Sequence, residues 1–116
     1  MENFEVVRED HNAVSILRLR GFLDAHTAPQ FEQAIQDLLS EDRTKIIVSM
    51  ADLNYISSAG LGVFMGFIEE IREREGDIKL SNMSDKVFKV FDLLGFPALY
   101  QIFSHESEAE KIYNQE

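Results

Sequence analysis

Hydrophobic and polar residues follow two different patterns in the first fifty residues: they alternate in one segment, and another segment is almost entirely apolar. From Leu17 to Arg20 leucine and arginine alternate, as in a strand with one face in water. Residues 4–8 and 13–20 are therefore predicted to form an antiparallel pair near a sheet edge. Residues 45–50, the run KIIVSM, are apolar with little alternation, which is typical of a central strand covered on both faces.

Helical spacing of apolar residues follows each of these strands. Thr27 and Gln30 have the spacing of a capping box, and Pro29 is compatible with a first helical turn, so a helix is predicted to begin there. Its expected core residues are Phe31, Ile35, Leu38 and Leu39. A second helix is predicted from the segment Ser57–Gly62 to about Glu75, with Gly76 as its C′ residue. Its expected apolar face is Leu61, Phe64, Met65, Ile68 and Ile71.

The last third of the chain repeats this alternation. Ser84 is predicted to cap a helix that stops at Gly95 and Pro97, and a short acidic helix is expected near 105–114. The core residues expected on the helix after Ser84 are Val87, Val90, Phe91 and Leu94. Further strands are predicted near 77–82 and 99–103.

This order of elements predicts an α/β fold: one domain over residues 1–116, with a mixed sheet of about five strands and about four helices. Loops after parallel strands emerge at the carboxyl edge of such a sheet, where these folds bind ligands. We therefore expect three loops to lie near one another in space: 21–27, 51–58 and 82–84.

Charge and composition narrow the function. The 116 residues include 11 basic and 21 acidic side chains, a formal net charge of −10, which disfavours binding to nucleic acid or to an anionic membrane. A protein partner with a basic face fits better. The absence of cysteine excludes disulfides and thiolate ligands, and no histidine pair has metal-ligand spacing, so we predict no metal and no cofactor. No signal peptide or long apolar run is present, which predicts a cytoplasmic protein.

The segment YISSAGLGVFMGF, Tyr55–Phe67, contains more serine and glycine than a helix start requires. One serine is enough for an N-cap, and each helical glycine costs about 1 kcal/mol relative to alanine. A hydrolase using Ser58 and His26 is one interpretation, but the elbow G-x-S-x-G is half missing, and no phosphate-binding lysine motif is present. Phosphorylation of the serine is favourable, because a helix amino terminus accommodates a dianion.

Three segments, GFLDAHTAPQFEQAI, KIIVSMADLNYISSAGLGVFMG and IKLSNMSDKVFKVFDLLGF, together resemble the STAS domain, and among its branches the anti-sigma factor antagonists. The resemblance covers essentially the whole chain. The phosphorylation loop of that family, usually Asp-Ser-Ser/Thr-Gly-Leu-Gly, corresponds here to residues 57–62, with Ser57 in place of the aspartate and Ala59 in place of the second hydroxyl residue.

The resemblance implies a non-enzymatic switch protein. Its partners would be an anti-sigma factor that is also a serine kinase, and a metal-dependent phosphatase of the PP2C type. The unphosphorylated protein would bind the kinase and so release the sigma factor. Alignment places the phosphorylated residue at Ser58, with Ser57 as the alternative acceptor.

The matching Gly-x-Leu-Asp segment would place Asp24 beside the phosphorylation loop. The predicted partner-binding residues are Asp24, Ser57, Ser58, Ala59, Gly60, Leu61, Gly62, Met65 and Met83. The domain is expected to be a monomer or a weak dimer. The alternative is a STAS interaction module of another system, such as the regulatory partner of a transporter ATPase, which would not require phosphorylation.

Overall fold

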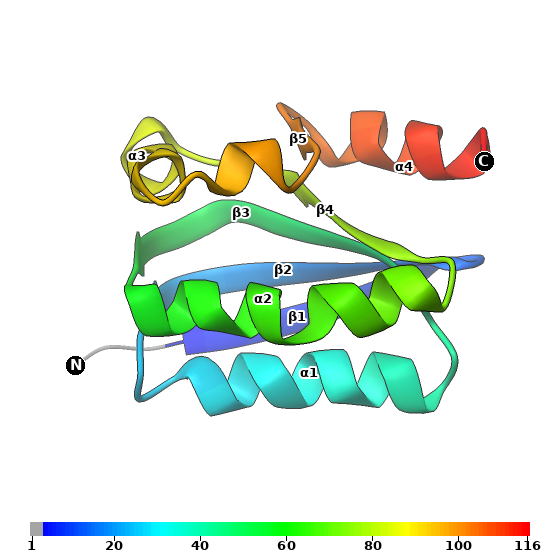
Figure 1. The fold of residues 1–116 in the computed structure, drawn as a ribbon, viewed down its shortest axis with the longest axis horizontal. Helices are drawn as coiled ribbons and strands as arrows, with labels where there is room; N and C mark the ends of the chain where they lie inside the picture. The colour runs from blue at the N-terminus through cyan, green and yellow to red at the C-terminus, as the bar shows by residue number, and fades with distance from the viewer. Residues whose placement is uncertain (1–3) are drawn as a thin grey trace.

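A five-stranded mixed sheet forms the centre of the molecule, which a computed structural model describes over residues 4–116 (Figure 1). The strand order is β1-β2-β3-β4-β5, with β1 antiparallel to β2 and the other neighbours parallel. The strands are β1 (Phe4–His11), β2 (Val14–Leu23), β3 (Lys45–Ile56), β4 (Asp77–Ser81) and β5 (Ile102–Phe103). The predicted mixed sheet with its opening hairpin is confirmed.

The described residues also form four α-helices and one short 3-10 helix, η1 (Phe96–Ala98). The α-helices are α1 (Ala28–Ser40), α2 (Ser58–Glu73), α3 (Asp85–Leu93) and α4 (Glu106–Asn114). Helices α1 and α2 run side by side and, with α3, bury the main core against one face of the sheet (Figure 1). Helix α4 covers the opposite face, where Tyr113 packs with Ile16 and Ile47.

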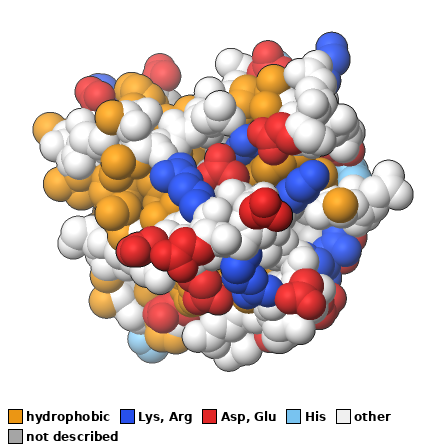
Figure 2. Space-filling view, turned by 45° about the vertical axis from the view of Figure 1, so that its right-hand side comes forward, with side chains coloured by type: hydrophobic (Ala, Val, Ile, Leu, Met, Phe, Trp, Pro, Cys, Tyr) orange, Lys and Arg blue, Asp and Glu red, His pale blue; other side chains and the backbone are white. Residues whose placement is uncertain are grey.

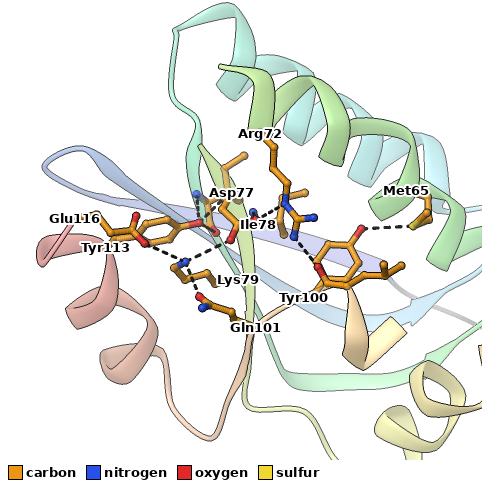
Figure 3. Close-up of polar contacts among 11 residues, drawn as sticks. Met65, Arg72, Asp77, Ile78, Lys79, Tyr100, Gln101, Tyr113 and Glu116 are labelled. Atoms are coloured by element: carbon orange, nitrogen blue, oxygen red, sulfur yellow. Dashed lines mark hydrogen bonds and ion pairs between the residues drawn. The ribbon is translucent and has the colours of Figure 1, made fainter. Parts of the chain in front are cut away.

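The contact between α4 and the sheet includes a buried lysine. The Lys79 side chain is only 2% exposed, and its Nζ lies 4.3 Å from the centroid of the Tyr113 ring while donating to Gln101 Oε1 at 2.7 Å (Figure 3). The Tyr113 hydroxyl is within hydrogen-bond distance of the Ile46 and Asp77 carbonyl oxygens, at 2.8 and 2.7 Å. Burial of this phenol raises its pKa well above the ordinary value. The C-terminal helix is thereby fixed to strands β3 and β4.

The predicted capping box at the start of α1 is wrong. Thr27 precedes the helix but makes no side-chain cap, because its hydroxyl instead donates to the Phe22 carbonyl at 2.8 Å and accepts from Asp24 N at 3.0 Å. The Gln30 amide donates to the Phe4 carbonyl rather than to the helix start. Local competition for the hydroxyl by the end of β2 overrides the sequence motif.

The end of α2 also differs from the prediction. The left-handed residue is Glu75, with φ of 66°, rather than Gly76. Gly76 N donates to Ile71 O at 2.9 Å, and Glu75 N donates to Arg72 O at 3.0 Å, which together form a Schellman motif. Glycine is required one position later for space, since a Cβ on Gly76 would lie 2.1 Å from Thr44 O.

Two residues predicted in the core lie at the surface. Met65 is 46% exposed, and Leu94, which follows the last turn of α3, is 55% exposed. The other predicted core residues of α2 are buried: Leu61, Phe64, Ile68 and Ile71. Met65 lies at the margin of the apolar stripe, where its sulfur still contacts the Tyr100 hydroxyl.

The carboxyl edge of the sheet is uneven. Strand β3 pairs with β4 only as far as Ser49 opposite Ser81, and then continues to Ile56 paired with β2 alone. Seven more residues span about 23 Å in extended conformation. The loops 21–27 and 51–58 therefore meet as predicted, through the bond of Ser57 N to Leu23 O, whereas the segment 82–84 leaves the sheet level with Ser49.

Candidate functional site

Ser57 is the N-cap of α2. Its backbone is extended, with φ of −103° and ψ of 172°, and its Oγ accepts from the Gly60 backbone N–H at 3.4 Å. Its own N–H donates to Leu23 O at 2.9 Å, which fastens the start of α2 to the end of β2. The hydroxyl of Ser57 therefore has a structural partner.

Ser58 is the first residue of α2 and is exposed to solvent. In contrast to Ser57, its side chain makes no hydrogen bond to any of residues 4–116. The N–H groups of the first helical turn lack partners within the helix and carry the positive end of its dipole, and no acidic residue occupies this turn. The geometry separates the two serines: Ser57 Oγ caps the helix, and Ser58 is exposed with no side-chain hydrogen bond to the described residues.

Asp24 stands at the end of β2, one residue beyond the pair formed by Leu23 and Ile56. Its Oδ1 accepts from the backbone N–H groups of His26 and Thr27, at 2.9 and 3.1 Å, and so shapes the turn that leads into α1. Because Leu23 O also binds Ser57 N, the turn of Asp24 and the start of α2 adjoin. The expected proximity of Asp24 to the serine loop follows from the pairing of β2 with β3.

The glycines of α2 differ in function. Gly60 is buried, and a Cβ there would lie 2.7 Å from Leu23 Cγ and 3.1 Å from Leu23 O, so this glycine allows α2 to pack against β2. Gly62 and Gly66 are exposed, with no neighbouring atom within 4 Å of the position of a Cβ. Leu61 is a core residue, 1% exposed. Gly60 and Leu61, predicted to bind a partner, thus lie inside the fold and can only position the surface.

Ser58, Gly62 and Met65 form one exposed stripe on α2, since residues three and four apart share a helix face. A shallow groove of about 210 Å³ runs beside this stripe, between α1 and α2. Its lining residues are Glu32, Ala59, Gly62, Val63, Gly66 and Phe67. The missing side chains of the two glycines keep the groove open next to Ser58.

Exposed apolar side chains are also found outside α2, and Figure 2 shows hydrophobic atoms gathered on the left of the face that it draws. Leu93 is 85% exposed, and Leu94 and Leu99 are also exposed. The sequence interpretation missed these residues, although Leu93 falls outside the apolar stripe of α3 and could have been recognised for that reason. Met83, which was predicted to bind a partner, is half-buried and packs against the main core.

The hydrolase interpretation finds no catalytic pair here. Over residues 4–116 no hydrogen bond joins Ser58 to His26, whose backbone N–H binds Asp24 while its ring is exposed. Across that same part of the chain no group of three or more histidine or acidic side chains could hold a metal ion. None of the described helices is long and apolar enough to cross a membrane.

Comparison with known proteins identifies the fold. The sequence profile of the STAS domain matches residues 5–109, nearly the whole chain. The chain belongs to the STAS domain family. An anti-sigma F factor antagonist of Paenibacillus polymyxa is 31% identical over 111 residues, covering 92% of each chain. An anti-sigma-B factor antagonist of Listeria monocytogenes is 27% identical over 106 residues, covering 91% of this chain and 92% of that one.

Solved STAS domains agree with this assignment. The unphosphorylated anti-sigma factor antagonist SpoIIAA has a TM-score of 0.83 and 26% identity, covering 98% of both chains. SpoIIAA of Bacillus in its phosphorylated form has a TM-score of 0.73 over 96% of this chain and 99% of that one, also at 26% identity. The predicted STAS fold is confirmed.

Proposed function

We propose that this STAS domain is an anti-sigma factor antagonist that switches partners through reversible phosphorylation of Ser58. The unphosphorylated protein binds an anti-sigma factor serine kinase and frees its sigma factor. A PP2C-type phosphatase removes the phosphate and so restores the form that binds the kinase. The observation that carries the proposal is the exposed Ser58 hydroxyl at the amino end of α2, beside a Ser57 hydroxyl that is used as the cap. The relatives named as antagonists, and the existence of SpoIIAA in phosphorylated and unphosphorylated forms, support it.

The electrostatics of α2 favour a switch that leaves the fold intact. A phosphoserine adds about −1.5 to −2 charges, which the unpaired N–H groups and the helix dipole at Ser58 partly compensate. The absence of an acidic residue in this turn removes a source of repulsion. The new charge then acts mainly on whatever docks along Ser58, Gly62 and Met65. A partner that covers this stripe would have to desolvate the dianion, so phosphorylation expels it.

The residues proposed to bind the partner are revised by their exposure. Ser58, Ala59, Gly62 and Met65 form the exposed part, and Asp24 is half-buried beside the start of α2. Ser57, Gly60 and Leu61 act by holding that part in place. Met83 has less surface to offer than the exposed leucines of α3 and η1.

The test is phosphorylation by the cognate kinase with ATP, followed by intact-mass measurement. We expect one phosphate in the wild type and none in Ser58→Ala. Ser57→Asp is the matched control, because aspartate retains the N-cap and should leave the phosphate on Ser58. Phosphate incorporation in Ser58→Ala at the wild-type rate would rule out the assignment.

A second arm separates phosphorylation from folding. Ser58→Asp should weaken kinase binding at least about tenfold, or 1.4 kcal/mol, while the thermal midpoint moves by no more than about 4 °C. Unfolding of this variant would contradict the argument from the helix terminus.

The alternative function is a STAS module that regulates a transporter ATPase without phosphorylation, and replacement of the family aspartate by Ser57 is the observation that favours it. Affinity capture distinguishes the two. Recovery of a histidine-kinase-like ATPase supports the antagonist, and recovery of an ABC-type ATPase supports the alternative.

A further inference from the structure

Met65 is the most exposed methionine among residues 4–116. It is 46% exposed, whereas Met50 is fully buried and Met83 is half-buried against the core. The chain contains no cysteine that could react first. Because a thioether is oxidised more readily when solvent reaches it, the fold makes Met65 the preferred target of an oxidant over the other two.

A buried hydroxyl is directed at this sulfur. Tyr100 is 5% exposed, and its hydroxyl donates to Met65 Sδ at 3.8 Å, a contact visible in Figure 3. No other hydrogen bond of this hydroxyl is formed with the described residues. A thioether is a weak acceptor, so the buried donor is poorly satisfied.

The donor keeps its proton at neutral pH. Burial raises the pKa of Tyr100 to about 12. Arg72 holds the ring in place: its guanidinium carbon lies 5.6 Å from the ring centroid, Nη2 donates to Leu99 O at 2.6 Å, and Nε donates to Asp77 Oδ1 at 3.1 Å (Figure 3). A fixed, protonated phenol thus faces the thioether.

We propose that Met65 is a site of oxidation to methionine sulfoxide by hydrogen peroxide, with the Tyr100 hydroxyl as the built-in donor to the sulfoxide oxygen. The sulfur lone pair attacks one peroxide oxygen, the S–O bond forms and the O–O bond breaks. The hydroxyl proton of the attacked oxygen passes to the second oxygen, which leaves as water, so the sulfur loses two electrons and the peroxide gains them. A thiol-dependent methionine sulfoxide reductase reverses the change.

The modification changes the same stripe that contains Ser58. Met65 is seven residues after Ser58 and on the same face of α2, so oxidation replaces an apolar contact by a strong polar acceptor within the docking surface. This consequence rests on the proposed function, whereas the oxidation itself does not. Oxidant and kinase would then act on one surface through different residues.

The experiment treats the full chain with dilute hydrogen peroxide and maps oxygen incorporation by mass spectrometry. Trypsin leaves Met50 and Met65 in one peptide, 46–72, so fragment ions are used to separate them, while Met83 lies in 80–86. We expect Met65 to gain oxygen several-fold faster than Met83 and Met50. Equal or slower oxidation of Met65 overturns the proposal. Met65→Leu, which keeps an apolar side chain of similar size, should abolish the fast gain of oxygen by peptide 46–72.

The role of Tyr100 is tested through thermal midpoints before and after oxidation. In the wild type we expect oxidation to lower the midpoint by less than about 4 °C, and in Tyr100→Phe by clearly more, because the sulfoxide oxygen then lacks its donor. The same shift in both proteins would overturn the assignment of Tyr100. Kinase binding by the oxidised and unoxidised forms is measured separately. If the oxidised and unoxidised forms both bind the kinase weakly, the result counts against the proposed function. Whether Met65 is the preferred oxidation site is still decided by the mass-spectrometric measurement.

Discussion

Gly60 and Gly62 stand two residues apart on α2, yet replacing each by alanine should have opposite effects on stability. A methyl at Gly62 meets open space, so Gly62→Ala removes only the helix penalty of glycine and should stabilise the fold by up to about 1 kcal/mol. A methyl at Gly60 would lie 2.7 Å from Leu23 Cγ and 3.1 Å from Leu23 O. Leu23 is fully buried, so its side chain cannot move aside at low cost.

The magnitude follows from these contacts. Overpacking of this kind costs about 1–3 kcal/mol, and a shift of Gly60 would also weaken its long bond to Ser57 Oγ. We expect Gly60→Ala to be destabilised by about 1–2 kcal/mol, which separates the two variants by about 1–3 kcal/mol. With about 4 °C per kcal/mol in a domain of this size, their thermal midpoints should differ by about 4–12 °C.

The assay is thermal and urea unfolding of both variants, together with kinase binding. Gly62→Ala adds a methyl on the stripe between Ser58 and Met65, so it should bind the partner more weakly although it is more stable. Equal midpoints for the two variants would refute the assignment of Gly60 to the β2 contact. Unchanged binding by Gly62→Ala would refute the assignment of Gly62 to the docking surface.

Two further substitutions test other parts of the fold. Gly76→Ala would place a methyl 2.1 Å from Thr44 O and should cost about 3 kcal/mol in urea unfolding, since only the backbone can give way; a loss under about 1 kcal/mol would contradict the contact. His11 Nδ1 binds Glu110 at 2.8 Å and its Nε2 binds Glu9, and these bonds, the first above all, raise the pKa of His11 above 6.5. Because the pKa of His11 is higher in the folded state, the protonated imidazole stabilises the fold below pH 6.5, and this stabilisation is lost as the pH rises through the folded pKa. The difference in thermal midpoint between the wild type and His11→Gln should therefore be largest below pH 6.5 and become small at alkaline pH.

Much of the fold could be predicted from the sequence because burial is periodic. The alternation from Leu17 to Arg20 and the apolar run 45–50 identify an outer and a central strand, and both are present. Ser84 caps α3 by accepting from Val87 N at 3.2 Å, as predicted. Each of these features depends on residues that are close together in the chain, so the local sequence is enough to predict it.

The errors come from contacts that the local sequence pattern does not reveal. The Thr27 hydroxyl had a suitable position for a capping box, but the Phe22 carbonyl at the end of β2 binds it instead. The need for glycine at position 76 depends on Thr44, which lies just before β3 and far from Gly76 in the sequence, so the sequence pattern did not reveal it. Met65 fits the spacing of a core residue and is nevertheless 46% exposed. The sequence specifies the elements more directly than the contacts between them.

The replacement of the family aspartate by Ser57 becomes intelligible once the cap is seen. Aspartate and serine are both preferred N-caps, so either residue can accept from the third N–H of α2, which here belongs to Gly60. The two differ in charge. With serine, no carboxylate lies at the cap beside Ser58, and a phosphate at Ser58 meets less repulsion from the protein itself. Ser57→Asp should therefore retain the midpoint within about 2 °C and slow phosphate transfer, and a variant that is phosphorylated as fast as the wild type would show that charge at this position is irrelevant to the switch.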